Sequence, residues 1–195
     1  IGGKDSMSGS FNDIDVPPTL CSFAVDVAHL SDVITPELKA AGNKLVKFNI
    51  EKDEYQVPVY DQLMSLYGTI TEMIHDGVIV SAYAGCQGGI SEAVSKMAFG
   101  NKLGVTFDDS ITADDLFNVE YGNIIAEVAA DRVQDLKGKY DTVGVVTEAA
   151  VFEVAGAKIN LEEALSAWTS KLEKVFPTRS GVEDKEIKTG LYDTK

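Results

Sequence analysis

Apolar residues recur at helical spacing in three segments of the chain. The longest covers residues 58–76, where Val59, Leu63, Leu66 and Ile70 fall on one face. Pro58 suits the first turn of a helix, and the glycine at position 77 is a typical stop signal. Shorter stripes with the same period cover residues 90–99 and 161–174. The pattern therefore predicts three main helices.

Between these helices lie short apolar runs of strand length. They predict strands at residues 19–27, 45–50, 78–83, 103–107, 124–129 and 142–147, short helices at 112–117 and 132–136, and a hairpin at 151–159 that turns at Gly156. The run at 19–27 is almost continuously apolar, so we expect it to be buried on both faces, with Cys21 as a small core residue. Asn160 is placed to cap the last helix, with Glu163 as its partner in a capping box.

Strands and helices are mixed along the chain without strict alternation. This order predicts an α+β fold, a three-layer α/β/α-like arrangement in which helices 58–76, 90–99 and 161–174 cover a mixed sheet. Residues 1–18 are expected to form a glycine-rich loop, and residues 19–177 the folded domain. Residues 178–195 are polar and aperiodic, which predicts a linker or a disordered tail.

Charge excludes two classes of partner. The chain carries 31 acidic and 17 basic residues, for a formal net charge of −14. Nucleic acids and anionic membranes both require clustered positive charge, so neither is an expected partner. The two cysteines are too few for a disulfide framework, and their use fits a reducing cytoplasm.

The first candidate for chemistry is the opening loop, residues 2–8. Glycines let the backbone approach an anion, backbone N–H groups can point at it, and a lysine adds charge. We therefore consider phosphate binding by this loop, with its acidic or hydroxyl side chain near a metal, against the alternative of an ordinary surface turn. Its spacing differs from that of a Walker A motif. The residues concerned are Gly2, Gly3, Lys4, Asp5 and Ser6.

The second candidate is the turn at residues 85–89, which joins a strand to a helix. Gly88 and Gly89 fall at the helix N-terminus, where free N–H groups and the helix dipole favour an anion. The alternative is a tight turn that requires glycine for steric reasons. Our hypothesis is that the two loops converge on one anion. Cys86 lies at the same helix N-terminus, which can lower the pKa of its thiol. Nucleophilic catalysis would also need a base, and the sequence places none near Cys86.

Three pairs of carboxylates remain. Asp13 and Asp15 follow the opening loop and have the chemistry to bind Mg²⁺ beside a phosphate. Asp108–Asp109 and Asp114–Asp115 flank a strand end and a helix start, where aspartate is a common cap. A solvated acidic face is the alternative for all three pairs, and the sequence leaves any metal ligands unknown.

Taken together, several segments resemble phosphoribosylformylglycinamidine synthase, in particular the C-terminal domain of its second synthetase half, which shares its fold with aminoimidazole ribonucleotide synthetase. The similar segments are GGKDSMS followed by VPPTL, then KMAFGNKLGV, VGVVTEAAVFEV and WTSKLEKVFPT, in family order from residue 2 to about residue 178. The chain begins inside a glycine-rich loop, so we expect it to be part of a larger protein.

The resemblance implies a ligase of purine synthesis. Its cofactors would be ATP/ADP and Mg²⁺, and its nitrogen source would be ammonia released from glutamine. The resemblance also implies that the chain contributes phosphate-binding loops and inter-domain packing, that its partners are the remaining synthetase and glutaminase domains, and that the chain alone is inactive. An apolar face left by missing domains would also favour self-association.

One departure from the family pattern weakens the nucleotide site. Many relatives carry an acidic residue directly before the second Gly-Gly pair, where this chain has Gln87, a poor ligand for Mg²⁺. A His-Asp pair of the relatives is replaced by Tyr83 and Ala84. Two alternatives therefore stay open beside the ligase role: a purely structural scaffold domain with a degenerate site, and a free-standing small-molecule sensor.

Overall fold

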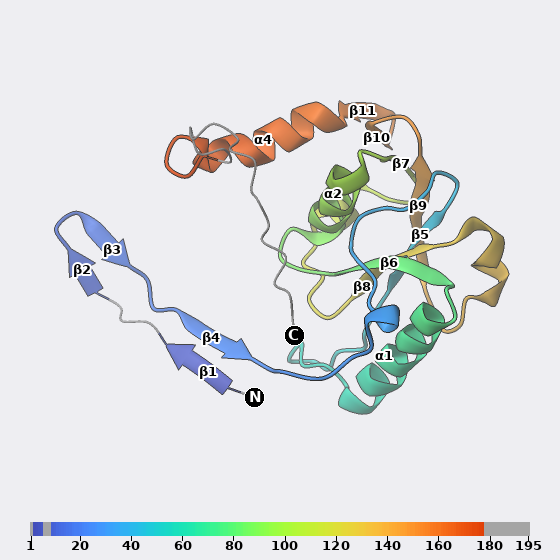
Figure 1. Ribbon diagram of the computed structural model, residues 1–195, viewed down its shortest axis with the longest axis horizontal. Helices are drawn as coiled ribbons and strands as arrows, with labels where there is room; N and C mark the ends of the chain where they lie inside the picture. Colours follow the sequence, from blue (N-terminus) through green and yellow to red (C-terminus); the bar gives the residue numbers. More distant parts are fainter. Residues whose placement is uncertain (1, 6–8, 178–195) are drawn as a thin grey trace, which may run out of the picture. The chain divides into compact units, whose positions relative to one another are not determined.

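The computed structural model describes residues 2–5 and 9–177 and divides the chain into two units, Ile1–Val33 and Ile34–Lys195 (Figure 1). Ser6, which belongs to the predicted phosphate loop, and the predicted tail at 178–195 lie outside the described residues.

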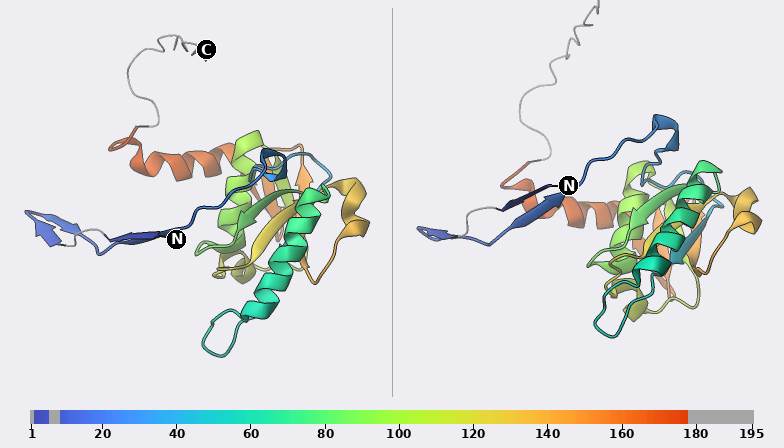
Figure 2. Two further views of the ribbon diagram at one scale, coloured as in Figure 1. Left: turned by 60° about the horizontal axis from the view of Figure 1, so that its bottom comes forward. Right: turned by 90° about the horizontal axis from the view of Figure 1, so that it is seen from below.

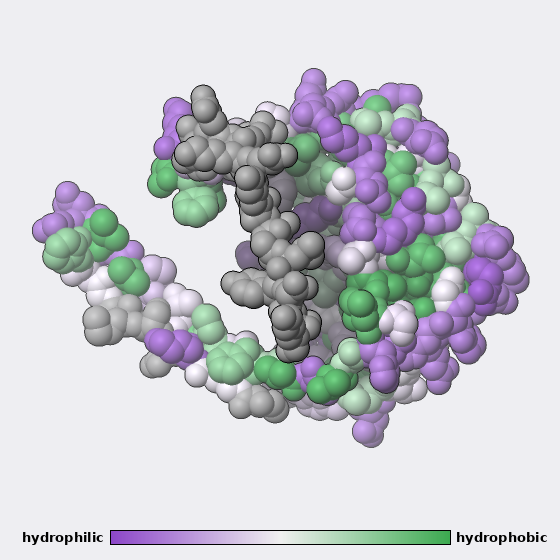
Figure 3. All heavy atoms as spheres, in the orientation of Figure 1, coloured by the Kyte–Doolittle hydropathy of each residue, from purple (hydrophilic) through white to green (hydrophobic). Residues whose placement is uncertain are grey.

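Unit 1 contains two small antiparallel sheets. Strand β1 (Gly2–Asp5) pairs with β4 (Leu20–Phe23), and β2 (Gly9–Phe11) pairs with β3 (Ile14–Val16), followed by a 3₁₀ turn, η1 (Leu30–Asp32). Apolar side chains are exposed along both sheets (Figure 3), among them Phe11, Leu20 and Phe23, and Val25 is exposed beyond the end of β4.

Two predictions for this region are wrong. Residues 2–18 contain strands rather than a loop, because each small sheet satisfies its backbone groups by local pairing. Burial of the 19–27 run is also wrong, and Cys21 is exposed. Within the described residues β4 pairs with β1 alone, so its apolar sequence has no second layer to bury it.

Unit 2 is built on a seven-stranded sheet with the order β11-β10-β7-β9-β5-β8-β6. The pairing of β10 with β7 is parallel and the other neighbours are antiparallel, so the sheet is mixed. The strands are β5 (Lys44–Phe48), β6 (Ile79–Ala84), β7 (Gly104–Phe107), β8 (Ile124–Val128), β9 (Asp141–Thr147), β10 (Val151–Val154) and β11 (Ala157–Asn160).

Helices cover both faces of this sheet (Figure 2), which confirms the predicted fold class. They are α1 (Tyr60–His75), α2 (Gly89–Asn101), α3 (Ala113–Phe117) and α4 (Leu161–Glu173), with a 3₁₀ segment η2 (Ala130–Asp135). Side chains alternate along β8: Ile125 packs in the core with α2, whereas Ala126 and Val128 pack in the core with α1.

The termini of the helices follow from local sequence. Gly77 adopts a positive φ of 69° directly after α1, as a C-terminal stop requires. Thr112 and Asp115 form a capping box at the start of α3, and the Asn160 side chain accepts from the N–H groups of Glu162 and Glu163 at the start of α4.

A buried carboxyl group ties the segment before β5 to the sheet. Glu127, on β8, is 0% exposed. Its oxygens accept from the backbone N–H of Lys39 at 2.8 and 3.0 Å, from that of Ala40 at 3.1 Å, and from the side-chain amide of Asn43 at 2.7 Å. The Asn43 oxygen in turn accepts from the Ala130 N–H at 3.0 Å. One buried side chain thus accepts from three donor groups, and the Asn43 amide among them is buried as well.

We expect Glu127→Leu to lower the free energy of unfolding by about 3–5 kcal/mol, because it leaves these donors without acceptors. Urea unfolding of the full chain measures the change. Glu54→Leu is the control, since Glu54 is exposed in a loop, and its effect should stay within about 0.5 kcal/mol. Equal effects of the two substitutions would contradict the structural role of Glu127.

Candidate functional site: a glycine turn and a polar network at one end of the sheet

The glycine turn joins β6 to α2 and packs tightly against residues 116–120. A Cβ atom on Gly85 would lie 2.3 Å from the Glu120 carbonyl oxygen. One on Gly89, whose φ is +66°, would lie 2.4 Å from the carbonyl oxygen of Asn118. Backbone therefore approaches backbone too closely for any side chain, and steric need accounts for glycine at these two positions.

The N–H groups of the predicted anion site have acceptors within the chain. Gly88 donates its N–H to Glu92 Oε2 at 3.0 Å, and Gly89 donates to the Cys86 carbonyl at 3.1 Å. Glu92 Oε1 also accepts from Lys96 Nζ at 2.6 Å. A carboxylate supplied by α2 itself thus lies where an external anion would bind.

The surroundings of Glu92 favour its charged form. Hydrogen bonds from the Cys86 thiol and from Lys96 lower the pKa of Glu92 from 4.5 to about 2. Burial raises the pKa of the Cys86 thiol, and its hydrogen bond to the Glu92 carboxylate raises it further. The lowered thiol pKa considered from the sequence is therefore wrong, because burial and a neighbouring carboxylate oppose ionisation of the thiol.

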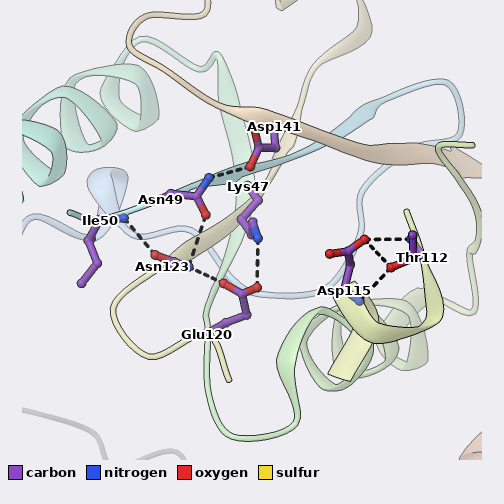
Figure 4. Close-up of polar contacts among 8 residues, drawn as sticks. All are labelled: Lys47, Asn49, Ile50, Thr112, Asp115, Glu120, Asn123 and Asp141. Atoms are coloured by element: carbon purple, nitrogen blue, oxygen red, sulfur yellow. Dashed lines mark hydrogen bonds and ion pairs between the residues drawn. The ribbon is translucent and has the colours of Figure 1, made fainter. Parts of the chain in front are cut away.

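A polar network lies at the same end of the sheet (Figure 4). Lys47, on β5, forms an ion pair with Glu120 at 2.9 Å, and their side chains are only 16% and 6% exposed. Asn123 contacts the other oxygen of Glu120 and accepts from the Ile50 N–H at 2.8 Å. These residues join β5 to the segment that precedes β8, and thereby fix the backbone against which the glycine turn packs.

The network continues along the ends of β9 and β7. Asn49 donates to Asp141 Oδ2 at 2.6 Å (Figure 4). Hydrogen bonds from the Ser110 side chain and backbone lower the pKa of Asp108, and the Thr112 hydroxyl and N–H do the same for Asp115. Together with Lys47 and Asp141, these two aspartates line an open depression of about 460 Å³.

Sequence reasoning missed the central members of this network. Lys47, Glu120 and Asn123 belong to no short motif, and only the sheet topology brings them together. The capping role considered for Asp114–Asp115 is confirmed for Asp115. Asp108 instead closes a tight turn through Ser110.

The predicted phosphate residues fall in different units. Gly2, Gly3, Lys4 and Asp5 form β1 of unit 1, whereas Gly88 and Gly89 belong to unit 2. Convergence of the two loops on one anion stays a prediction. Within residues 2–5 and 9–177, no group of three or more His, Cys, Asp or Glu side chains is arranged to hold a metal ion. Gln87 and the bonded Gly88 N–H also fit a magnesium nucleotide poorly.

The low pKa of Glu92 predicts a pH-dependent contribution to folding. A carboxyl group whose folded pKa is about 2, against 4.5 ordinarily, stabilises the fold above about pH 4.5 and loses that effect as pH falls toward 2. Glu92→Gln should therefore cost about 1 kcal/mol near pH 6 and progressively less in acid, as measured by urea unfolding at several pH values. Glu54→Gln is the control. A difference from wild type that is constant with pH would contradict the assignment.

The steric reading of the turn predicts unequal costs for two glycine substitutions. Gly89→Ala should destabilise the chain by about 2–4 kcal/mol, because it adds a backbone clash to a strained φ. Gly138→Ala, where φ is also positive at +81° but no atom lies within 4 Å of the added carbon, is the matched control. It should cost only about 1 kcal/mol. Thermal and urea unfolding measure both, and a similar cost at the two positions would refute the reading.

Comparison with known proteins identifies the fold. No protein-family model matches the sequence. Among solved structures, the chain is similar to phosphoribosylformylglycinamidine synthase II from Thermotoga maritima, with a TM-score of 0.55 and 15% identity over 66% of this chain and 27% of that one. For the PurLQS structure from Thermotoga maritima the TM-score is 0.59, at 15% identity over 69% of this chain and 28% of that one.

Another similar structure is Thermotoga maritima PurL complexed with ATP, with a TM-score of 0.55 and 14% identity over 68% of this chain and 27% of that one. The chain thus spans 27–28% of the length of these three structures. The shared features are the large mixed sheet and the helices on its faces. The chain therefore has the mixed α+β fold of the phosphoribosylformylglycinamidine synthases, which is the aminoimidazole ribonucleotide synthetase-like fold.

Proposed function

We propose that this chain serves as a domain of an ATP-dependent ligase of purine synthesis, which converts formylglycinamide ribonucleotide and glutamine to formylglycinamidine ribonucleotide. The observation that carries the proposal is the likeness of its fold to phosphoribosylformylglycinamidine synthase II and PurLQS. The sequence segments that resemble this family, from GGKDSMS to WTSKLEKVFPT, support the same assignment.

Within that ligase, the scaffold role is the one that the geometry favours for unit 2. Glu92 holds the Gly88 N–H, and Gln87 replaces the acidic residue of many relatives. The domain then contributes inter-domain packing, while ATP and Mg²⁺ act elsewhere in the enzyme. Its partners are the remaining synthetase and glutaminase domains, its location is the cytoplasm, and the chain alone is inactive. No helix in the described part of the chain is long and apolar enough to cross a membrane.

The second candidate role is phosphate or nucleotide binding by the glycine-rich segment of unit 1. Lys4 and the glycines beside it supply suitable chemistry, and Thermotoga maritima PurL has been solved with ATP and with ADP.

The ligase assignment is tested on the protein encoded by the complete reading frame. We expect ADP formation that depends on both formylglycinamide ribonucleotide and an ammonia source. Glu92→Gln should leave kcat within about twofold of wild type, because a residue that only closes a turn touches no reacting atom. ATP hydrolysis that ignores formylglycinamide ribonucleotide would refute the assignment.

Calorimetry separates the two roles. Titration of the chain with ADP and Mg²⁺ should give no saturable heat, since the turn already holds a carboxylate. Saturable binding that is weakened at least about fivefold by Lys4→Met, but not by Lys52→Met, would favour nucleotide binding by the glycine-rich segment of unit 1 instead.

A further inference from the structure

A second cavity of unit 2 is lined by residues of α2, α3, α4 and the β10–β11 hairpin, and its wall includes Glu92, which caps the glycine turn. Its volume is about 430 Å³, within the range of small-molecule sites. Four aromatic side chains are part of its wall: Phe99, Phe117, Phe152 and Trp168. The ring of Phe99 stacks on Trp168 with centroids 5.6 Å apart, which holds the indole in place while 56% of Trp168 stays exposed. Phe117 is 67% exposed.

Among the described side chains that line this cavity, Lys96 and Glu92 carry charge. The carboxylate of Glu92 already accepts from Gly88, Lys96 and Cys86. An ammonium group has three donors. Lys96 gives one of them to Glu92, and its Nζ lies 5.8 Å from the centre of the Tyr83 ring and 5.9 Å from that of the Trp168 ring. The cavity therefore offers a ligand one charged donor beside an exposed aromatic face.

We propose that this aromatic groove binds a planar aromatic ligand that carries an anionic group. The ring of the ligand packs against Trp168 and Phe117. Contacts between aromatic rings stabilise a complex by more than the apolar area that they bury. The anionic group accepts a charge-assisted hydrogen bond from the Lys96 ammonium group. The size of the cavity suits one or two fused rings and excludes a packed helix, whose diameter is about 10 Å. The inference is independent of the ligase assignment.

The test uses the single tryptophan of the chain. In a ¹⁵N-labelled sample the indole N–H of Trp168 gives one signal, so a titration reports on the groove directly. The probe is 2-naphthoate, and we expect a saturable shift with a Kd below about 1 mM. Cyclohexanecarboxylate keeps the charge without the aromatic face, and 2-naphthamide keeps the rings without the charge. Both should bind at least about fivefold more weakly.

Substitutions localise the binding. Lys96→Met and Phe117→Ala should each weaken 2-naphthoate at least about fivefold. Phe176→Ala is the control and should leave the Kd unchanged, because Phe176 is 81% exposed and lies outside the cavity wall. Backbone amide signals show whether each variant is folded, and Phe117→Ala removes only an exposed ring. Equal binding of the three probes, or a shift that never saturates, would overturn the proposal. A shift of the indole signal that depends only on protein concentration, and that Phe117→Ala abolishes, would also overturn the proposal. Such a shift would mean that a second copy of the chain covers the groove.

Discussion

The fold of unit 2 depends on a buried carboxyl group that the sheet cannot satisfy by itself. Glu127 points from β8 into the core beneath α2, where water is absent, and its acceptors are matched by the backbone of residues 39 and 40 and by Asn43. Removing such a group from water is costly unless every acceptor finds a donor. The segment before β5 is consequently held in one conformation. In this conformation Leu38 packs in the core between α2 and the sheet.

The same principle explains the glycine turn. Free N–H groups at a helix N-terminus need an acceptor, and α2 provides one from its own first turn through Glu92. Lys96 then balances the charge of this carboxylate. The turn is thus complete within the chain, and its glycines are explained by the close approach of residues 116–120. The glycine motif resembles an anion-binding site in the sequence. In the structure it is a tight turn whose Gly88 N–H already has an acceptor within the chain.

Much of unit 2 was predictable from the sequence because its signals are local. The helices at 58–76, 90–99 and 161–174 are confirmed with small shifts of their ends, and the hairpin turn at Gly156 is confirmed by pairing of Val154 with Ala157. The failures have a common cause. The run at 19–27 carries the composition of a buried strand, but composition does not reveal whether a second layer exists. Lys47 and Glu120 were missed for the related reason that their pairing depends on strand order.

The hairpin formed by β10 and β11 has a consequence for the last helix. Ala155 and Gly156 both adopt positive φ, 47° and 80°, the backbone of a two-residue connection whose twist matches its strands. Their turn places Asn160 opposite Val151, and Asn160 caps the N-terminus of α4. Because 3.6 residues complete each helical turn, the residue at which a helix begins decides the direction in which every later side chain points. Two residues of unusual backbone geometry therefore set the rotational phase of a 13-residue helix, and with it the direction in which its indole ring faces.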